Sequence, residues 1–477
     1  MVVCSYTRGE DHRHSHSSYA ITEMIAAFSN WKLTEFSALL EAKITVARCI
    51  SATVEQIPNM SATTEQDQRA SIALSMLFVL YALGFTNLFL RGSLGILAPT
   101  ISAEMQLSPE TLSLVASSFF FAYAIMQIPS GMLLDRFGAR WTLSALLLFT
   151  TAGAALFAVA ATSGQLILAR VLMGVGCAGI FSGAFFVVNQ WVAADRVVTQ
   201  TGVLNSVAAL GGLCATAPLA ALITFYPWRD CYLVFTAGVA VLMIAVALGL
   251  REPADAAAAR KQRSESLGDV LVGVSRANSQ PGMKRLIVVG IPLSAQTTLI
   301  GVWGAPYLRD VHGLDDIGSG NVLLVMAILS VFGHAFLGFL ARYFNSIKWV
   351  IISSATLIFA LDLVLVLVEQ PPLWLVTAVF ASIAFVAMYP MLAFAHARAL
   401  VPGELVGRGV AVTNMGIMSA IAFAQLVFGW IVGLFPFENG ASPELAYRTA
   451  FAVLAGLTGL AIIIYAPVRD GRLNAPR

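Results

Sequence analysis

Long apolar stretches alternate with short polar breaks along most of the chain after residue 70. A helix that crosses a bilayer needs about 20 mostly apolar residues, and twelve stretches are long enough. They are residues 72–98, 111–134, 141–161, 165–190, 199–223, 229–250, 285–307, 319–341, 349–368, 373–396, 407–434 and 446–466. A longer polar gap separates the sixth from the seventh. The pattern predicts an all-α membrane protein with twelve transmembrane helices in two six-helix halves.

The polar segments divide the chain into five parts. Their bounds are 1–69 for a polar cytoplasmic N-terminal extension, 70–250 for the first half, 251–283 for a cytoplasmic linker, 284–467 for the second half and 468–477 for a cytoplasmic tail. The extension contains no apolar stretch long enough to span a bilayer. Met60 begins a short polar lead-in that is typical of a first membrane helix. We therefore expect native translation to start at Met60, so that the preceding residues are not native.

Composition agrees with the membrane interpretation. Hydrophobic residues make up 58% of the 477 residues and charged residues only 11%, whereas a soluble protein has about a quarter charged. The net charge of +2 and the lack of a basic stripe give no sign of a nucleic-acid partner. The five cysteines are scattered without the spacing of a disulfide framework or a metal site. We expect a lipid bilayer as the surroundings and no cofactor or metal. An enzyme is the least favoured class, because no nucleophile motif appears.

Positive residues indicate how the helices are oriented, since cytoplasmic loops of membrane proteins are enriched in Lys and Arg. With the N-terminus inside, the inner loops hold Arg136, Arg140, Arg342 and Lys348 together with most other basic residues. The outer loops carry mainly acids. This predicts a multi-pass protein of the cell (inner) membrane with both termini in the cytoplasm.

A charged break lies between the second and third apolar stretches. Residues 131–140 read G-M-L-L-D-R-F-G-A-R, with three charges inside ten residues and a glycine on either side of Asp135 and Arg136. The pattern G-x-L-x-D-R-x-G-x-R resembles the loop between the second and third membrane helices of the major facilitator superfamily of transporters. A short cytoplasmic loop that merely collects arginine is the alternative. The stretch that begins at residue 407 is expected to start on the same cytoplasmic face, where Asp135 can stabilise its N-terminus and latch the two halves together. The predicted gating residues are Gly131, Asp135, Arg136, Gly138, Arg140 and Arg408.

Further motifs extend the resemblance over residues 70 to 467. A second, shorter copy of the charged loop runs from Gly338 to Lys348, and it has Ala341 where the first copy has its acid. The run from Arg170 to Gly176 looks like the family pattern R-x-x-x-G-x-G in helix 4. The resemblance implies the major facilitator fold, with two parallel repeats and a binding site between them near the membrane midplane.

In this family, helices 1, 4, 7 and 10 line the central cavity, and two arginines fall on the first two of these helices. Arg91 and Arg170 have no nearby acid in the sequence, so they favour an anion, which arginine binds through a bidentate fork. Arg91 lies near a helix end and could instead extend to the membrane surface. Arg170 could instead hold backbone carbonyls of a neighbouring helix. Both alternatives stay open.

Polar and aromatic residues complete the predicted substrate site. Gln296 and Trp303 are two helical turns apart and share a face of helix 7, while Tyr389 stands beside Pro390 in helix 10. In helix 2, Tyr123 and Gln127 are an i, i+4 pair. Each of these side chains could equally pack between helices.

The titratable groups Asp362 and His334 lie in helices 9 and 8, which are not primary cavity helices. The sequence therefore argues against a carboxylate relay through the main cavity, and a coupling ion is left open. We predict a secondary active or facilitative transporter of a small organic anion or zwitterion, such as an organic acid or dipeptide, acting as a monomer by alternating access. The charge pattern resembles the anion- and organic-acid-transporting branches, and a dipeptide branch is also compatible. Drug or metabolite efflux and a transporter-like receptor are the alternatives.

Overall fold

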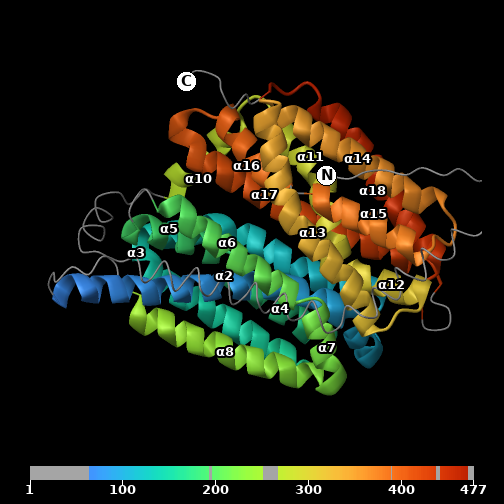
Figure 1. Cartoon of the computed structure of the whole chain (residues 1–477), viewed down its shortest axis with the longest axis horizontal. Helices are drawn as coiled ribbons and strands as arrows, with labels where there is room; N and C mark the ends of the chain where they lie inside the picture. The colour runs from blue at the N-terminus through green and yellow to red at the C-terminus, as the bar shows by residue number, and fades with distance from the viewer. Residues whose placement is uncertain (1–63, 193–195, 251–266, 388, 437–440, 471–477) are drawn as a thin grey trace, which may run out of the picture. The chain divides into compact units, whose positions relative to one another are not determined.

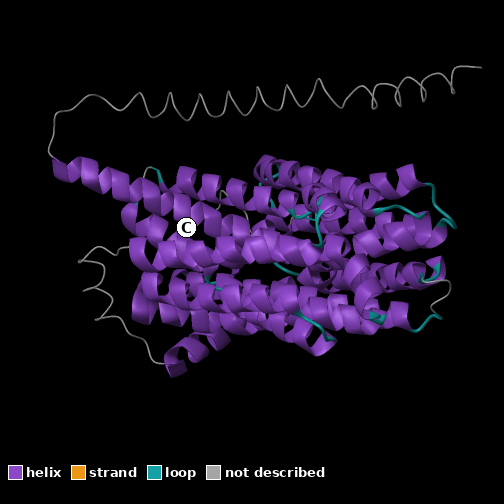
Figure 2. Ribbon diagram, turned by 90° about the horizontal axis from the view of Figure 1, so that it is seen from below, coloured by secondary structure: helices purple, strands orange, loops and turns teal. Residues whose placement is uncertain are grey.

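The computed structural model describes residues 64–192, 196–250, 267–387, 389–436 and 441–470. Every regular element among them is a helix (Figure 2). The chain divides into two units, Met1–Arg69 and Ala70–Arg477, and the fold below is that of the second unit. Most of the expected N-terminal extension, including Met60, lies outside the described residues.

The apolar stretches expected between residues 72 and 250 coincide with helices. They form α2 (Thr64–Met105), α3 (Pro109–Val159), α4 (Ser163–Cys177), α5 (Ile180–Trp191), α6 (Val197–Cys214), α7 (Ala217–Phe225) and α8 (Trp228–Gly249). Two expected stretches fall within the 51 residues of α3, which is broken at Gly138 by a φ of 79°. This left-handed conformation is easily adopted only by glycine, so the second glycine of the charged motif ends one helix and lets the next begin.

The later part of the chain is organised in the same way. Its elements are α10 (Leu267–Asn278), α11 (Met283–Thr298), the π-helix η1 (Leu299–Trp303), α12 (Gly304–His312), α13 (Asp316–Tyr343), α14 (Ile347–Leu367), α15 (Leu373–Val386), α16 (Tyr389–Leu400), the short 3₁₀ helix η2 (Gly403–Leu405), α17 (Val406–Gly433) and α18 (Glu444–Tyr465). In Figure 1 the helices from α2 to α8 lie toward the lower left and those from α11 to α18 toward the upper right. We call these two groups the first and second halves.

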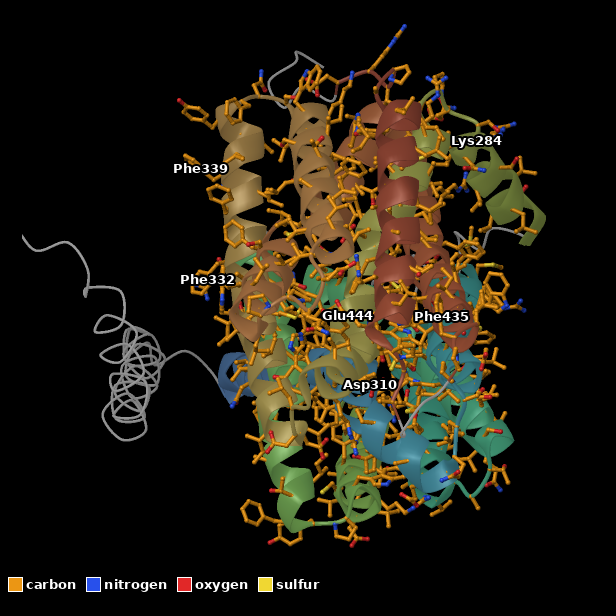
Figure 3. The ribbon with its side chains drawn as sticks, turned by 90° about the vertical axis from the view of Figure 1, so that its right-hand side faces the viewer. Lys284, Asp310, Phe332, Phe339, Phe435 and Glu444 are labelled. Atoms are coloured by element: carbon orange, nitrogen blue, oxygen red, sulfur yellow. The ribbon has the colours of Figure 1, made fainter. Side chains whose placement is uncertain are left out.

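The helices have the length and surface of membrane spans. Among the described residues, nine are long and apolar enough to cross a membrane, or ten if α6 and α7, bent by 42°, are one span. The expected seventh span is not among them, because η1 divides it into the shorter helices α11 and α12. Large apolar side chains such as Phe332 and Phe339 are more than half exposed and point away from neighbouring helices (Figure 3). Such surface suits contact with lipid.

Side-chain caps fix the starts of several helices. A hydroxyl or carboxylate at the N-cap accepts a hydrogen bond from a backbone N–H of the first turn, which would otherwise lack a partner. These caps are Ser108 for α3, Thr162 for α4, Asp315 for α13 and Ser346 for α14. These hydrogen bonds mark where the four helices begin.

Glycines allow the closest helix contacts in the first half. A Cβ on Gly174 of α4 would overlap the carbonyl of Phe119 in α3, and one on Gly211 of α6 would overlap the carbonyl of Phe85 in α2. Small residues at such points let the backbones of membrane helices approach each other. The motif glycine of helix 4 therefore has a packing role.

The two halves press together at the end where α3 begins, which we call the Glu110 end. Here α17 packs against α3, so that a Cβ on Gly433 would overlap Glu110 and one on Gly429 would overlap Ser113. Nearby, Gly320 of α13 lies against Ala220 of α7. The opposite end, with the charged motif and the start of α17, is called the motif end.

Candidate functional site

Arg91 lies where the two halves meet. It is half-buried on α2, and its guanidinium stands over the rings of Phe120 and Tyr123 of α3, 5.4 and 5.9 Å from their centroids. Its Nη2 is 3.9 Å from the Sδ of Met418 on α17. Within the described residues no acid pairs with it. A cation over aromatic faces, between two halves and without a carboxylate, is a suitable group to bind an anion.

Arg170 of α4 is completely buried in the first half, behind Arg91. Its Nη1 donates to the carbonyl of Leu90 at 3.0 Å, and its guanidinium lies 4.6 Å from the ring centroid of Phe119. Its Nε and Nη2 have no hydrogen-bond partner. Because Leu90 precedes Arg91 directly, Arg170 holds α2 at the residue that meets the other half.

Neighbouring polar groups support α2 on both sides. Asn87, one turn before Arg91, donates to the carbonyl of Cys177 at 2.8 Å, and its Oδ1 has no partner. Ser93 and Tyr232 of α8 are hydrogen-bonded at 2.6 Å. The sequence prediction did not include Asn87, although an amide in an apolar helix was a visible signal. These bonds fix the rotation of α2 and therefore the direction of Arg91.

Tyr123 and Gln127, the pair predicted in helix 2, lie in different environments. Tyr123 is buried and contacts Arg91 through its ring. Gln127, one turn further along α3, is half-buried and its Oε1 has no partner. The structure therefore brings Tyr123 to Arg91 and leaves a polar group of Gln127 available on the same helix.

In the second half, the predicted residues of helix 7 are buried. Gln296 donates from Nε2 to Oδ2 of Asp362 at 3.2 Å, and its Oε1 has no partner. Trp303, at the end of η1, lies 5.3 Å from the ring centroid of Phe428 on α17, and its Nε1 has no partner. The side chain of Tyr389 lies outside the described residues. Asp362 of α14 thus contacts α11, a contact that the sequence analysis did not predict.

Gln425 on α17 is a further candidate that the sequence prediction missed. It is completely buried, and neither atom of its amide has a partner. A Cβ on Gly301 of η1 would lie 3.6 Å from its Nε2, so the amide faces the π-helix. A glutamine among apolar residues of the eleventh stretch was the available signal.

The predicted gating residues lie at the motif end. Asp135 and Arg136 are exposed, Gly131 is half-buried, and the guanidinium of Arg136 lies 5.5 Å from the ring centroid of Phe137. Arg140 donates from Nε to the carbonyl of Ala247 near the end of α8 at 2.7 Å. That bond stays within the first half. The helix dipole stabilises a cation such as Arg140 near the carbonyl end of α8.

Arg408, at the start of α17, lies against the linker helix α10. A Cβ on Gly273 of α10 would overlap its guanidinium. In the structure, the contact of Arg408 with α10 therefore joins the second half to the helix of the linker.

The chain is similar to known membrane transporters. The model of the Major Facilitator Superfamily matches residues 80–390. A probable sulfoacetate transporter of Cupriavidus necator is 30% identical over 165 residues, which are 34% of this chain and 37% of that protein. A probable galactarate/D-glucarate transporter of Escherichia coli is 24% identical over 421 residues, covering 81% of this chain and 92% of that protein. The chain thus matches little more than a third of the sulfoacetate transporter and most of the second relative.

A solved structure agrees with the fold. The crystal structure of the nucleoside transporter NupG matches with a TM-score of 0.66 and 15% identity, covering 82% of this chain and 98% of that one. At this identity the similarity shows the fold alone.

Proposed function

The chain belongs to the Major Facilitator Superfamily and is an integral, multi-pass membrane protein, and we propose that it carries a small organic anion or zwitterion across the membrane by alternating access. The observation that carries the proposal is the position of Arg91, which contacts both halves and pairs with no described acid. The two relatives named above, whose names refer to anions, support an organic acid as the substrate.

The binding mode follows from the two arginines. Arg91 offers its guanidinium to a carboxylate or sulfonate, and Arg170 keeps α2 in place behind it. Tyr123 and Gln127 border the anion from α3, while Gln296, Trp303 and Tyr389 serve the rest of the substrate from the second half. When the halves rock, Arg91 and its bound anion change exposure from one side to the other.

The proposed topology has twelve transmembrane helices in two six-helix halves, 70–250 and 284–467, joined by the linker 251–283. The motif end faces the cytoplasm because its loops carry most of the arginines and lysines, so both termini are cytoplasmic and the protein lies in the cell (inner) membrane. The close contacts at the Glu110 end then support a state that is closed toward the outside.

Counterflow in liposomes tests the proposal. The purified full chain is reconstituted in vesicles loaded with unlabelled galactarate, D-glucarate or sulfoacetate, and entry of the same labelled acid is measured. A labelled nucleoside and a labelled dipeptide serve as comparisons. We expect counterflow with at least one acid and none with the nucleoside. Binding without flux would instead support a receptor, and flux of apolar cations alone would support drug efflux.

A further inference from the structure

Asp362 of α14 is the one acidic side chain that is buried among the described residues. It is completely inaccessible, its Oδ2 accepts the bond from Gln296, and its Oδ1 has no partner. Ionisable residues inside membrane helices are costly and in most cases functional. The transport site described above does not use this carboxyl group.

No described cation neutralises Asp362. The charged or titratable groups on the helices around it are Lys284 and Arg285 of α11, Asp316, Arg342 and Tyr343 of α13, Lys348 of α14, His396 and Arg398 of α16, and Glu444, Tyr447, Arg448 and Tyr465 of α18; α15 has none. None of them forms a hydrogen bond or ion pair with Asp362. The side chains of His334 and Tyr389 lie outside the described residues.

Several of these groups are committed to other partners. His396 is bonded to Tyr465 and to the carbonyl of Arg469, while Arg448 is bonded to the carbonyl of Val366. An ionised carboxylate buried without a cation costs several kcal/mol or more, whereas its neutral acid carries no such cost. A proton is therefore the simplest ligand that suits this position.

We propose that Asp362 carries the proton that couples transport to a proton gradient, with Gln296 as its positioning residue. This inference rests on the proposed function. A proton from the outer water adds to a carboxylate oxygen of Asp362 and forms an O–H bond. When the halves change sides, that bond breaks, the proton passes to the cytoplasmic water, and the carboxylate is restored.

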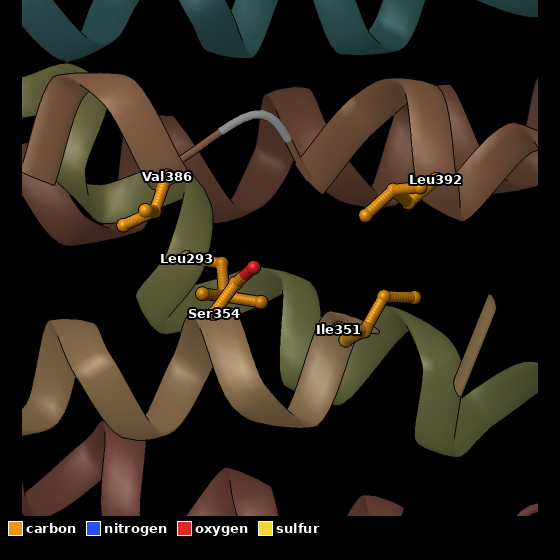
Figure 4. Close-up of a pocket in the computed structure, with 5 residues that line it drawn as sticks. All are labelled: Leu293, Ile351, Ser354, Val386 and Leu392. Atoms are coloured by element: carbon orange, nitrogen blue, oxygen red, sulfur yellow. The ribbon is translucent and has the colours of Figure 1, made fainter. Parts of the chain in front are cut away.

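The surroundings of Asp362 and Gln296 explain how the two residues respond when the halves move. Gln296 lies three residues before the π-helix η1, and π-bulges are frequent at functional sites. Toward the motif end, a narrow space is lined by Leu293, Ile351, Ser354, Val386 and Leu392 (Figure 4). Its walls come from α11, α14 and the two pieces of the tenth apolar stretch, α15 and α16.

This space adjoins the buried faces of α11 and α14 that carry Gln296 and Asp362. Leu293 is one turn before Gln296, and Ser354 is eight residues before Asp362 on α14. The space does not admit a water molecule in this state. A shift of α16 relative to α15 widens it and gives the proton of Asp362 a route to the motif end.

Proton-driven uptake tests the assignment. Vesicles containing the purified full chain receive labelled galactarate with the membrane potential held at zero. An inward gradient of about one pH unit should give about tenfold accumulation for one proton per substrate. In Asp362→Asn the accumulation should fall to about onefold, while counterflow stays within about twofold of the wild type. Glu369→Gln, the same change on an exposed side chain, should accumulate like the wild type.

The outcomes separate this inference from the proposed function. Absence of wild-type counterflow with galactarate, D-glucarate and sulfoacetate overturns the proposed function and this inference with it. Normal counterflow without any response to the pH gradient, or tenfold accumulation by Asp362→Asn, overturns the inference alone. If a different acid is exchanged, that acid replaces galactarate as the probe.

Two further variants keep the test decisive if Asp362→Asn does not reach the membrane. Asp362→Glu retains a carboxyl group and should retain accumulation, and its failure together with normal counterflow would overturn the assignment. Gln296→Leu should shift the pH profile of uptake, which a purely structural role would not move. Infrared spectra of the wild type should also show a carboxylic acid C=O band that Asp362→Glu displaces.

Discussion

The two halves of the unit use the same arginine contact at the Glu110 end but carry different buried charges. Arg229 at the start of α8 donates to two carbonyls where α3 ends, and Arg448 in α18 donates to the carbonyl of Val366 where α14 ends. Each arginine also pairs with an acid, Glu104 in the first half and Glu369 in the second. A cation at the carbonyl end of a helix is favourable in both places.

The interiors differ in the sign of their charge. The first half buries Arg170 behind the half-buried Arg91, whereas the second buries Asp362 against Gln296. The repeated arginine contact therefore belongs to the framework, and the unrepeated charges belong to function. In our proposals the first half binds the anion and the second half carries the proton.

The largest effect should come from removing the cation between the halves. Arg91→Ala should weaken the apparent affinity for galactarate by about 2–4 kcal/mol, or about 30- to 800-fold, because the substrate anion loses its charged partner. The concentration dependence of counterflow measures this. Arg309→Ala, on an exposed arginine at the Glu110 end, is the matched control. Wild-type affinity in Arg91→Ala would show that Arg91 extends to the membrane surface instead.

Arg170 should matter through its geometry. Arg170→Lys keeps the charge but loses the planar group over Phe119 and the bond to Leu90, so we expect a loss of about 1–3 kcal/mol in stability. Thermal unfolding in detergent should show a lower midpoint, and counterflow should show a lower affinity. An unchanged midpoint with lost affinity would mean that Arg170 binds substrate directly, and no change in either would remove it from the site.

A smaller effect on stability should distinguish two adjacent glycines of α6, Gly211 and Gly212. Gly211→Ala should destabilise the first half by about 1–3 kcal/mol, because its Cβ would overlap the backbone of α2. Gly212→Ala is the control, since the nearest atom to its Cβ would be 3.9 Å away. The second half offers the same test with Gly333→Ala, against Phe385, and Gly338→Ala, which meets no atom within 4 Å. Equal midpoints within each pair would contradict the role of close packing.

The sequence predicted where the helices lie better than which way they face. The stretch 72–98 lies inside α2, and the break expected in the charged motif occurs at Gly138. Both depend on length and local chemistry, which a sequence displays directly. The sequence did not predict that Gln296 meets Asp362, 66 residues away. Membrane helices are apolar on nearly all sides, so little periodicity shows which face meets a neighbour.

The smallest expected change in free energy concerns the charged motif, of which the second half has only a partial copy. Asp135 lies beside Arg136 in the first copy, whereas the second copy has the buried Ala341 in its place. If the motif end closes during transport, the start of α17 approaches Asp135. A carboxylate near a helix N-terminus contributes about 0.3–2 kcal/mol. The structure is closed at the Glu110 end, and Asp135 is exposed in it.

Asp135→Asn should therefore weaken the state that is closed at the motif end without preventing insertion. A loss of about 1–2 kcal/mol shifts two balanced states by about 5- to 30-fold. Cysteines placed in the parts of α3 and α17 near the motif end should react faster with a water-soluble thiol reagent. Turnover should slow. Arg342→Gln, in the copy without an acid, should change labelling much less. Equal labelling in Asp135→Asn and wild type, together with normal transport, would leave the motif as a topological loop and remove this difference between the halves.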